Sequence, residues 1–387
     1  MLFSRVHLFC RLLSSICCMT PQPIPFLSLS PQHDAIRQEA QDALTRVYDK
    51  NWFILGDALT AFEEAYAAFC GTSRCVGVGN GYDALVVALK TCGIEKGDEI
   101  IVPANTYVAT WHAAAQTGAI LRPVEPDPVT FNIDPQQIAQ HITSKTKAIL
   151  PVHLYGQACD MTTIMHLARN HDLMVVEDNA QAHGATWAGQ RTGSFGHANA
   201  NSFYPTKNLG ALGDGGAVTT SDEAKARWAR QFRNYGFASK HVCAEKGINS
   251  RLDEMQAALL SVKLKYLAQW NDQRQVLADA YREKLNGVGD LILPVSREGA
   301  QHVYHLFVIR TAQRDKLKEA LAKAGVETMI HYPIPPHLQP AYAEYGFRKG
   351  AFPLTERIAD TVLSLPLWPG MRDEQVVRVC DAISEFF

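Results

Sequence analysis

SFYPTKNLGALGDGGA, residues 202–217, places one lysine, Lys207, between the end of a predicted β-strand and a glycine-rich turn. Aromatic and apolar neighbours withdraw a lysine amine from water, which lowers its pKa and favours the neutral, nucleophilic form. A neutral amine attacks aldehydes, so Lys207 suits the formation of a Schiff base. The competing interpretation is a surface lysine after a strand, because lysine is nearly always exposed. The motifs around this stretch therefore have to decide between a Schiff-base lysine and an exposed surface lysine.

A carboxylate precedes Lys207 by 29 residues, at the end of an apolar strand in VVEDNAQAHGA, residues 175–185. Asp178 is suited to pair with a protonated pyridine nitrogen, which keeps such a ring able to accept electrons. Its alternative role is to cap a helix, because Asp is common at the start of helices. Gln181 follows at a distance that allows it to contact a phenolic oxygen of the same ring, or else it is a helix surface residue.

A phosphate requires a helix N-terminus with accessible backbone N–H groups. GVGNGYDALVVAL, residues 77–89, offers one directly after a strand. Asn80 and Gly81 form the tight turn there, although a junction of this kind is often ordinary turn chemistry. Ser202, five residues before the lysine, adds a hydroxyl donor. The turn and this serine together predict an anion site.

Strands alternate with helical patterns along most of the chain, the rhythm of βαβ units. This predicts an α/β fold with a mostly parallel sheet, in which ligands bind at the carboxyl ends of the strands. Tyr107, in PANTYVATW, lies just past one such end, where its ring is placed to lie against a planar ligand; a buried core aromatic is the alternative. The six strand candidates are CVGVGN, EIIVPANT, AILPVHLYG, LMVVED, ANSFYP and GAVTT.

After Arg251 the pattern changes to one long helical segment, residues 252–285, with apolar residues every three or four positions. We expect this segment to lead into a smaller C-terminal α+β domain. That domain should contain the strand HLFVIR, the helix RDKLKEALAKAG, the proline-rich loop HYPIPPHLQP and the helix DEQVVRVCDAISEFF. The predicted division is residues 19–262 for the large domain with an N-terminal segment, and 263–387 for the small domain.

Composition argues against several classes of function. The chain of 387 residues is 47% hydrophobic and 20% charged, which is typical of a globular protein with a large core. A net charge of −2 gives no general attraction to nucleic acid or to an anionic membrane. Nine cysteines without a CxxC pair predict no metal site and favour reduced thiols, and hence the cytoplasm.

Residues 1–18, MLFSRVHLFCRLLSSICC, differ from the rest of the chain. Arg11 interrupts the apolar run that a signal peptide needs, and Met19 opens a sequence typical of an ordinary start. We expect a disordered extension or a misplaced start codon. No later stretch is long and apolar enough to span a bilayer.

Seven motifs, from about residue 25 onward, resemble the DegT/DnrJ/EryC1/StrS family of sugar aminotransferases: GNGYDAL, PANTYVATW, VVEDNAQAHGA, SFYPTKNLGALGDGG, RNYG, GINSRLDEMQAALL and HYPIPPHLQP. The resemblance implies a fold-type-I homodimer with a mostly parallel seven-stranded sheet and with pyridoxal phosphate in shared active sites at the subunit interface. By matching motifs it also implies roles for eleven residues. Around the cofactor ring, Lys207 forms the internal aldimine, Asp178 pairs with the pyridine nitrogen, Gln181 contacts O3′ and Tyr107 stacks on the ring. Gly81, Tyr82 and Ser202 hold the phosphate, Asn249 reaches the neighbouring subunit's phosphate, and Tyr204, His331 and Tyr332 line the sugar pocket.

Within the family, the PANTY-x-ATW and VEP segments are similar to those of 3-aminotransferases that make 3-amino-3,6-dideoxyhexoses on dTDP. This implies transamination of a nucleotide-linked keto-sugar, a dTDP-3-keto-6-deoxyhexose aminated at C3, with L-glutamate as donor and 2-oxoglutarate as product. Lys207 would both anchor the cofactor and move the proton. Tyr82 departs from the small hydroxyl residue of many members, so that one side-chain donor is lost or replaced while the backbone N–H stays available.

Three alternatives stay open. A cofactor-dependent sugar dehydratase or lyase shares the fold, although the dehydratase relatives replace the lysine with histidine. A C4-aminating sugar aminotransferase differs in the position of the ketone. A regulatory or sensory protein would bind the cofactor without turnover. For the pyrophosphate of the substrate, Arg233 and Lys246 are candidates, and a solvated surface charge is the alternative for both.

Overall fold

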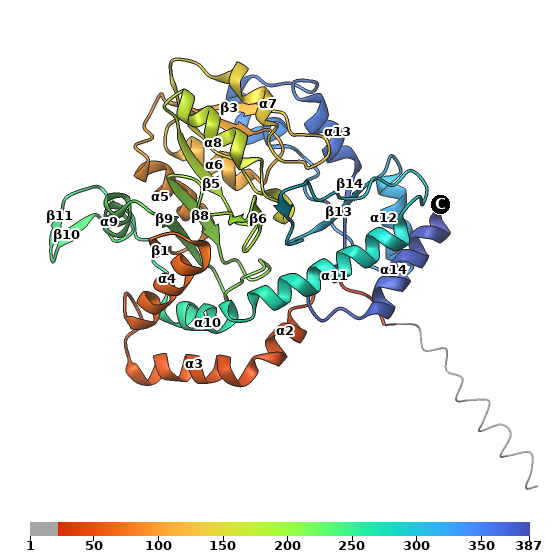
Figure 1. Cartoon of the computed structure of the whole chain (residues 1–387), viewed down its shortest axis with the longest axis horizontal. Helices are drawn as coiled ribbons and strands as arrows, with labels where there is room; N and C mark the ends of the chain where they lie inside the picture. Colours follow the sequence, from red (N-terminus) through yellow and green to blue (C-terminus); the bar gives the residue numbers. More distant parts are fainter. Residues whose placement is uncertain (1–21) are drawn as a thin grey trace, which may run out of the picture.

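The computed structural model describes residues 22–387, so the extension predicted for residues 1–18 lies outside the described residues. At the centre of this part is a seven-stranded sheet in the order β1-β9-β8-β5-β4-β2-β3 (Figure 1). Within it β9 runs antiparallel to both neighbours, and the other four pairs are parallel. The strands are β1 (Arg74–Val78), β2 (Glu99–Pro103), β3 (Ile120–Val124), β4 (Thr146–Ile149), β5 (Met174–Asp178), β8 (Ala198–Ser202) and β9 (Gly216–Thr220).

The predicted α/β fold with a mostly parallel seven-stranded sheet is confirmed, and each of the six strand candidates contributes a strand. The sequence pattern missed β3. This strand lies at the edge of the sheet and carries Arg122 and Pro123. Proline lacks the backbone N–H that a strand interior needs and is found mainly at edge strands and strand ends, so Pro123 hides this strand from a search for apolar β-branched runs.

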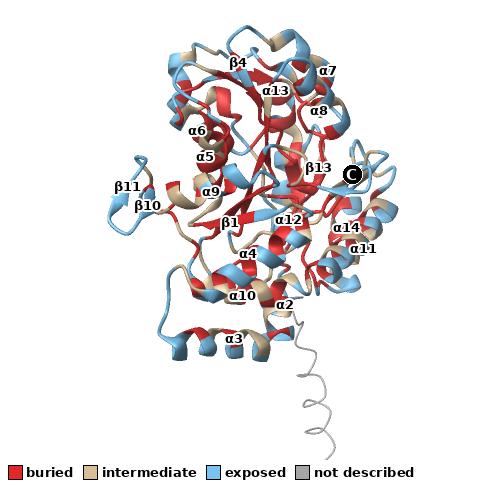
Figure 2. Ribbon diagram, turned by 60° about the vertical axis from the view of Figure 1, so that its left-hand side comes forward, coloured by how far each residue is buried: buried red, intermediate tan, exposed pale blue. Residues whose placement is uncertain are grey.

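Six of the described helices cover the sheet: α4 (Asp57–Cys70), α5 (Gly81–Thr91), α6 (Val108–Gln116), α8 (Met161–Asn170), α9 (Glu223–Phe232) and α10 (Glu254–Leu264). Successive residues of a strand point to opposite faces. Ile100 and Val102 therefore pack with α5, α6 and α9, whereas Ile101 packs with α8. The strands β2, β8 and β9 are buried on both faces, as is usual for a parallel sheet and as Figure 2 shows for the centre of the sheet, whereas the edge strand β3 exposes Ile120 and Arg122.

A second core lies beside the sheet. It is built by α11 (Leu267–Leu285), β13 (Phe307–Arg310), α12 (Arg314–Lys323), β14 (Val362–Leu365) and α14 (Asp373–Phe386). Ile24 also belongs to this core and is bridged to Val326, so the first described residues pack against the C-terminal part. The domain division at residue 262 stays a prediction.

The single long helical segment expected over residues 252–285 is instead two helices, α10 and α11, which meet at Lys265 and Tyr266. The break lets each helix bury its apolar residues in its own environment, α10 beneath the sheet and α11 mainly in the second core. Because the apolar spacing continues through the break, the sequence does not reveal it.

Shorter elements complete the described part of the chain. The α3 helix (Arg37–Lys50) packs along α10, with Ala43 against Val262, whereas the hairpin of β10 (Phe237–Ser239) and β11 (Val242–Cys243) projects from the body in Figure 1. None of the described helices has the length and apolar character needed to cross a membrane. The other elements are α2 (Ser30–Ala35), α7 (Pro135–Ile138), β6 (Thr186–Trp187), β7 (Gln190–Arg191), β12 (Ala300–Gln301), α13 (Pro353–Thr361) and the 3-10 helices η1 (Ala139–His141), η2 (Leu154–Gly156), η3 (Pro336–Leu338) and η4 (Pro340–Tyr345).

Candidate active site

Lys207 lies in a tight turn beyond the end of β8, where its backbone N–H donates to the Tyr204 carbonyl at 2.9 Å. The residue is half-buried, so the interpretation as a freely exposed surface lysine does not hold. Burial lowers the pKa of its amine from 10.5 to about 8, and the negative charge of Asp178 partly opposes this shift. An appreciable fraction of neutral amine is therefore present near neutral pH.

Polar side chains of two helices hold the loop that follows this lysine. Lys263 of α10 donates to the Gly210 carbonyl at 2.7 Å, and Asn208 donates to Asn271 of α11 at 2.9 Å. Gly210 has no room for a side chain, because a Cβ there would lie 2.2 Å from the carbonyl oxygen of Pro205. The glycine-rich motif indicated the tight turn, but no local pattern indicates Lys263, which is 53 residues away in sequence.

Asp178 ends β5 and is 6% exposed. Its Oδ2 accepts from the Thr110 hydroxyl at 2.9 Å, and its Oδ1 accepts from the Ala180 backbone N–H at 3.1 Å. Burial raises the pKa of this carboxyl, while the bond from Thr110 opposes the rise. The residues after Asp178 form turns and no α-helix, so it is not a helix cap. Thr110 was missed because it lies on α6, far away in sequence.

Gln181 is buried in one of these turns and is not on a helix surface. Its Oε1 accepts from the backbone N–H of Tyr155 at 2.7 Å, and its Nε2 donates to the Tyr332 hydroxyl at 2.9 Å. Gln181 is thereby placed between the end of β5 and the proline-rich loop. Tyr155 is a further residue that sequence reasoning missed, although it lies within the HLYG run.

The predicted phosphate site lies where α5 begins. Asn80 caps this helix, accepting from the Asp83 backbone N–H at 2.8 Å. Gly81 and Ser202 are in close contact, because a Cβ on Gly81 would lie only 2.4 Å from the Ser202 Cβ. The structure thus brings the helix N-terminus and the serine together as expected. Tyr82, the residue that departs from the family pattern, is half-buried, and burial raises the pKa of its hydroxyl.

Three aromatic side chains meet near the proline-rich loop. The rings of Tyr107 and Tyr332 are 5.2 Å apart, and those of His331 and Tyr332 are 5.4 Å apart. Tyr107 is 50% exposed, so the core alternative does not hold for it. His331 Nδ1 lies 2.8 Å from the Ser364 hydroxyl, and burial, with the charge of Lys207, lowers the pKa of this imidazole to about 4. Tyr204 is also exposed, at the turn before Lys207.

Asn249 is exposed and pairs through its backbone with Asn234, just after the projecting hairpin. Its neighbour Ser250 accepts from the backbone N–H of Gly79 at 2.9 Å, beside the start of α5. The contact of Asn249 with the neighbouring subunit's phosphate stays a prediction.

Neither sequence-based interpretation of Arg233 is correct. Its side chain is buried and its Nη1 lies 2.5 Å from Oε1 of Glu63, so it is neither a solvated charge nor available for a pyrophosphate. The same Glu63 oxygen accepts from the backbone N–H of Gly77 at 2.7 Å. This buried pair braces β1, which leads to the start of α5. Lys246 is exposed.

His183 was not singled out from the sequence, although it follows Gln181 by two residues. It is fully buried with its ring 5.8 Å from that of Phe203, and neither ring nitrogen has a partner among residues 22–387. Burial, together with the charge of Lys207, lowers the pKa of this imidazole to about 3. Buried nitrogens without partners near Lys207 are polar atoms that a ligand is able to satisfy.

The chain is similar to known proteins over nearly its whole length. A family model described as the DegT/DnrJ/EryC1/StrS aminotransferase family matches residues 34–384. The dTDP-3-amino-3,4,6-trideoxy-alpha-D-glucose transaminase of Streptomyces venezuelae is 46% identical over 367 residues, which are 95% of this chain and 97% of that protein. The dTDP-3-amino-3,6-dideoxy-alpha-D-galactopyranose transaminase of Aneurinibacillus thermoaerophilus is 47% identical over 363 residues, 94% of this chain and 99% of that protein.

A solved structure, that of S. venezuelae DesV in complex with a ketimine intermediate, superposes on this chain with a TM-score of 0.93. It is 46% identical and covers 94% of this chain and 98% of its own length. The fold that the resemblance implied is confirmed by this superposition.

Proposed function

The chain belongs to the DegT/DnrJ/EryC1/StrS aminotransferase family, and we propose that it transfers an amino group from L-glutamate to C3 of a dTDP-linked 3-keto-6-deoxyhexose. Its cofactor is pyridoxal phosphate, and its product enters amino-sugar biosynthesis. The observation that carries the proposal is that a half-buried lysine and a buried carboxylate lie at the carboxyl ends of adjacent strands. Lys207 lies in the turn after β8, and Asp178 is the last residue of β5, which pairs with β8 in parallel.

The residues around this pair fit the cofactor. The N-terminus of α5, with Gly81 against Ser202, offers donors for a phosphate group. Asp178, held by Thr110, offers a carboxylate for a ring nitrogen. Within the described residues, the buried nitrogens of His183 have no partner of their own, which suits a site that a polar group fills.

When bound, pyridoxal phosphate supplies an aldehyde for an amine and a cationic ring that accepts the electron pair released at the donor's Cα. Asp178 keeps the ring nitrogen protonated, because its charge favours the cationic form. Lys207, with its pKa near 8, takes the proton from Cα of glutamate as a neutral amine. In the second half of the reaction it returns a proton to the former keto carbon of the sugar.

The names of two close relatives support C3 of a dTDP-sugar as the position that is aminated. We assign Tyr204, His331 and Tyr332 to the sugar pocket. Their hydroxyl and imidazole groups suit a hydroxylated ring, and a site built on such hydrogen bonds rejects analogues that leave them unpaired. The position of the ketone should therefore matter strongly.

We also infer a homodimer in which Asn249 contacts the phosphate bound by the neighbouring subunit. Its exposed position after the projecting β10–β11 hairpin supports this role (Figure 1). A cytoplasmic location is supported by the thiols: all six cysteines of the described part are free, and five are buried.

The test is a panel of nucleotide-linked keto-sugars offered with glutamate, with products identified by mass. We expect the dTDP-3-keto-6-deoxyhexose to exchange its oxo group for an amino group, and 2-oxoglutarate to form in equal amount. Loss of water without 2-oxoglutarate would instead indicate a dehydratase. Amination of 4-keto sugars alone would show that the enzyme aminates C4 and not C3. No turnover with any sugar would contradict the proposal.

A further inference from the structure

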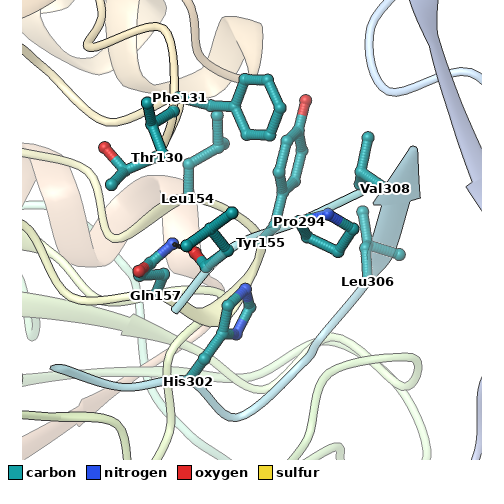
Figure 3. A pocket seen from close by; sticks show the side chains of 11 residues that line it. Thr130, Phe131, Leu154, Tyr155, Gln157, Pro294, His302, Leu306 and Val308 are labelled. Carbon is teal, nitrogen blue, oxygen red and sulfur yellow. Dashed lines mark hydrogen bonds between the residues drawn. The ribbon is translucent and has the colours of Figure 1, made fainter. Parts of the chain in front are cut away.

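Tyr155 joins the two parts of the site. The residue is 3% exposed, and its backbone N–H donates to Gln181 Oε1 at 2.7 Å. At its other end the phenolic hydroxyl donates to the carbonyl oxygen of His331. Figure 3 shows its ring beside that of Phe131, with the hydroxyl at the far end of the side chain. One residue thus contacts both the amide expected at the cofactor ring and the loop expected at the sugar.

These contacts form a closed circuit. Gln181 Nε2 donates to the Tyr332 hydroxyl at 2.9 Å, Tyr332 follows His331 in the chain, and His331 accepts from Tyr155. A backbone N–H only donates, so Oε1 of Gln181 must face Tyr155 and its amide nitrogen must face Tyr332. Tyr332 is therefore the acceptor in its bond with Gln181. Its own hydroxyl hydrogen is left free to donate to an oxygen of a ligand.

The circuit contains a backbone conformation that side chains rarely adopt. Tyr155 has φ 58° and ψ 4°, in the left-handed region. Its carbonyl accepts from the Leu306 backbone N–H at 3.3 Å, and its ring packs edge-on against Phe131 with centroids 5.8 Å apart. Strained conformations persist only where the surroundings fix them. Tyr155 therefore has a fixed position, which it passes on to Gln181 through its backbone and to the loop through its hydroxyl.

We propose that Tyr155 is a positioning residue that fixes the His331–Tyr332 loop relative to Gln181. Its hydroxyl is needed for binding of the keto-sugar and is not needed for the half-reaction with glutamate. The inference rests on the proposed function. The backbone bond to Gln181 survives any side-chain substitution, whereas the bond to His331 depends on the hydroxyl alone. A substitution that removes only the hydroxyl therefore breaks the bond to His331 and keeps the bond to Gln181.

The test compares Tyr155→Phe with Tyr281→Phe. Tyr281 is a matched control, because it is also fully buried and its hydroxyl also donates to a backbone carbonyl, that of Pro366, at 2.8 Å. In Tyr155→Phe we expect the half-reaction with glutamate, followed by cofactor absorbance, to stay within about twofold of wild type. The KM for the keto-sugar should rise roughly 5- to 10-fold, the effect of one lost hydrogen bond. Tyr281→Phe should change neither.

A second readout does not depend on turnover. Amide hydrogen exchange in residues 330–334 should be faster in Tyr155→Phe than in wild type and unchanged in Tyr281→Phe. Tyr155→Phe and Tyr332→Phe should also be non-additive in the KM for the sugar, because they break one circuit. Unchanged exchange, or equal losses in both half-reactions, would overturn the proposal for Tyr155. If the wild-type enzyme aminated no sugar, the proposed function would fail while the exchange experiment still decided the role of Tyr155.

Discussion

The amine of Lys207 is poorly solvated, which affects stability as well as chemistry. It titrates at 10.5 in the unfolded chain and at about 8 in the folded chain. The unfolded state therefore binds more protons between these two values, so stability rises with pH across this interval. Below pH 8 the full penalty of holding a charged, half-buried amine is present.

We expect Lys207→Met to stabilise the cofactor-free protein at about pH 7, by about 1–3 kcal/mol, because methionine carries no charge to desolvate. The gain should shrink as the pH approaches 10. Urea denaturation at both pH values measures this difference. Lys265→Met is the control, since Lys265 is exposed and paired with Glu39 at 3.3 Å. A gain that is the same at both pH values would contradict the interpretation.

Asp178→Asn keeps the shape of the side chain and removes its charge. We expect the half-reaction with glutamate to slow by roughly 100-fold or more, because the ring nitrogen loses the group that keeps it protonated. Thermal unfolding should change little, since the asparagine oxygen is able to accept from the Ala180 N–H while its amide nitrogen donates to the Thr110 hydroxyl, which then donates to Thr106. Near-normal turnover in Asp178→Asn would show that the carboxylate is only structural.

At the level of elements, the loop after Lys207 is held by α10. Lys263 Nζ donates to Gly210 and lies 3.0 Å from His33 Nε2, and burial lowers the pKa of its amine to about 8. Lys263→Met fills a similar volume but releases the loop. Because misplaced catalytic groups lose rate, we expect both half-reactions to slow by roughly 10- to 100-fold.

Stopped-flow absorbance of the two half-reactions checks this expectation, with Lys265→Met on the same stretch of chain as the control. Substitutions of Lys263 and Tyr155 should therefore differ in which half-reaction they slow. Lys263→Met should affect both half-reactions, whereas Tyr155→Phe should affect the sugar alone. A selective loss with the sugar in Lys263→Met would be evidence against the role of the loop contact.

Motifs that lie within one strand end and its turn could be read from the sequence, because their chemistry is local. Asp178, Ser202 and the start of α5 are such cases, and the structure brings them to one edge of the sheet. Thr110 and Lys263 could not be found in this way, since their partners lie 68 and 53 residues away. Such contacts depend on the three-dimensional arrangement of the strands and helices, which no local pattern encodes.

At the level of the whole molecule, the proposed sharing of active sites is testable by mixing two inactive proteins. Lys207→Ala and Asn249→Ala should each lack activity. Random exchange of subunits should restore about a quarter of the wild-type sites, because each mixed dimer has one site intact at both positions. Activity is assayed after exchange has been verified by native mass spectrometry.

The matched control mixes Lys207→Ala with Asp178→Asn. Both residues would belong to the same subunit's part of the site, so no mixed dimer contains an intact site and no activity should return. Equal recovery in both mixtures, or full activity of a monomer, would rule out the shared site.

The bridge between Ile24 and Val326 has a consequence for synthesis of the chain. Ile24 donates to Gly325 at 2.8 Å and accepts from Glu327 at 3.0 Å, and the neighbouring Phe26 donates to a Glu327 carboxylate 301 residues later. A ribosome adds about 5–20 residues per second, so the first strand-like segment leaves the ribosome roughly 15–60 s before its partner exists. During that interval an apolar residue that ends fully buried is exposed to solvent and to other chains, and a chaperone that recognises Ile24 and its neighbours would have this window in which to bind.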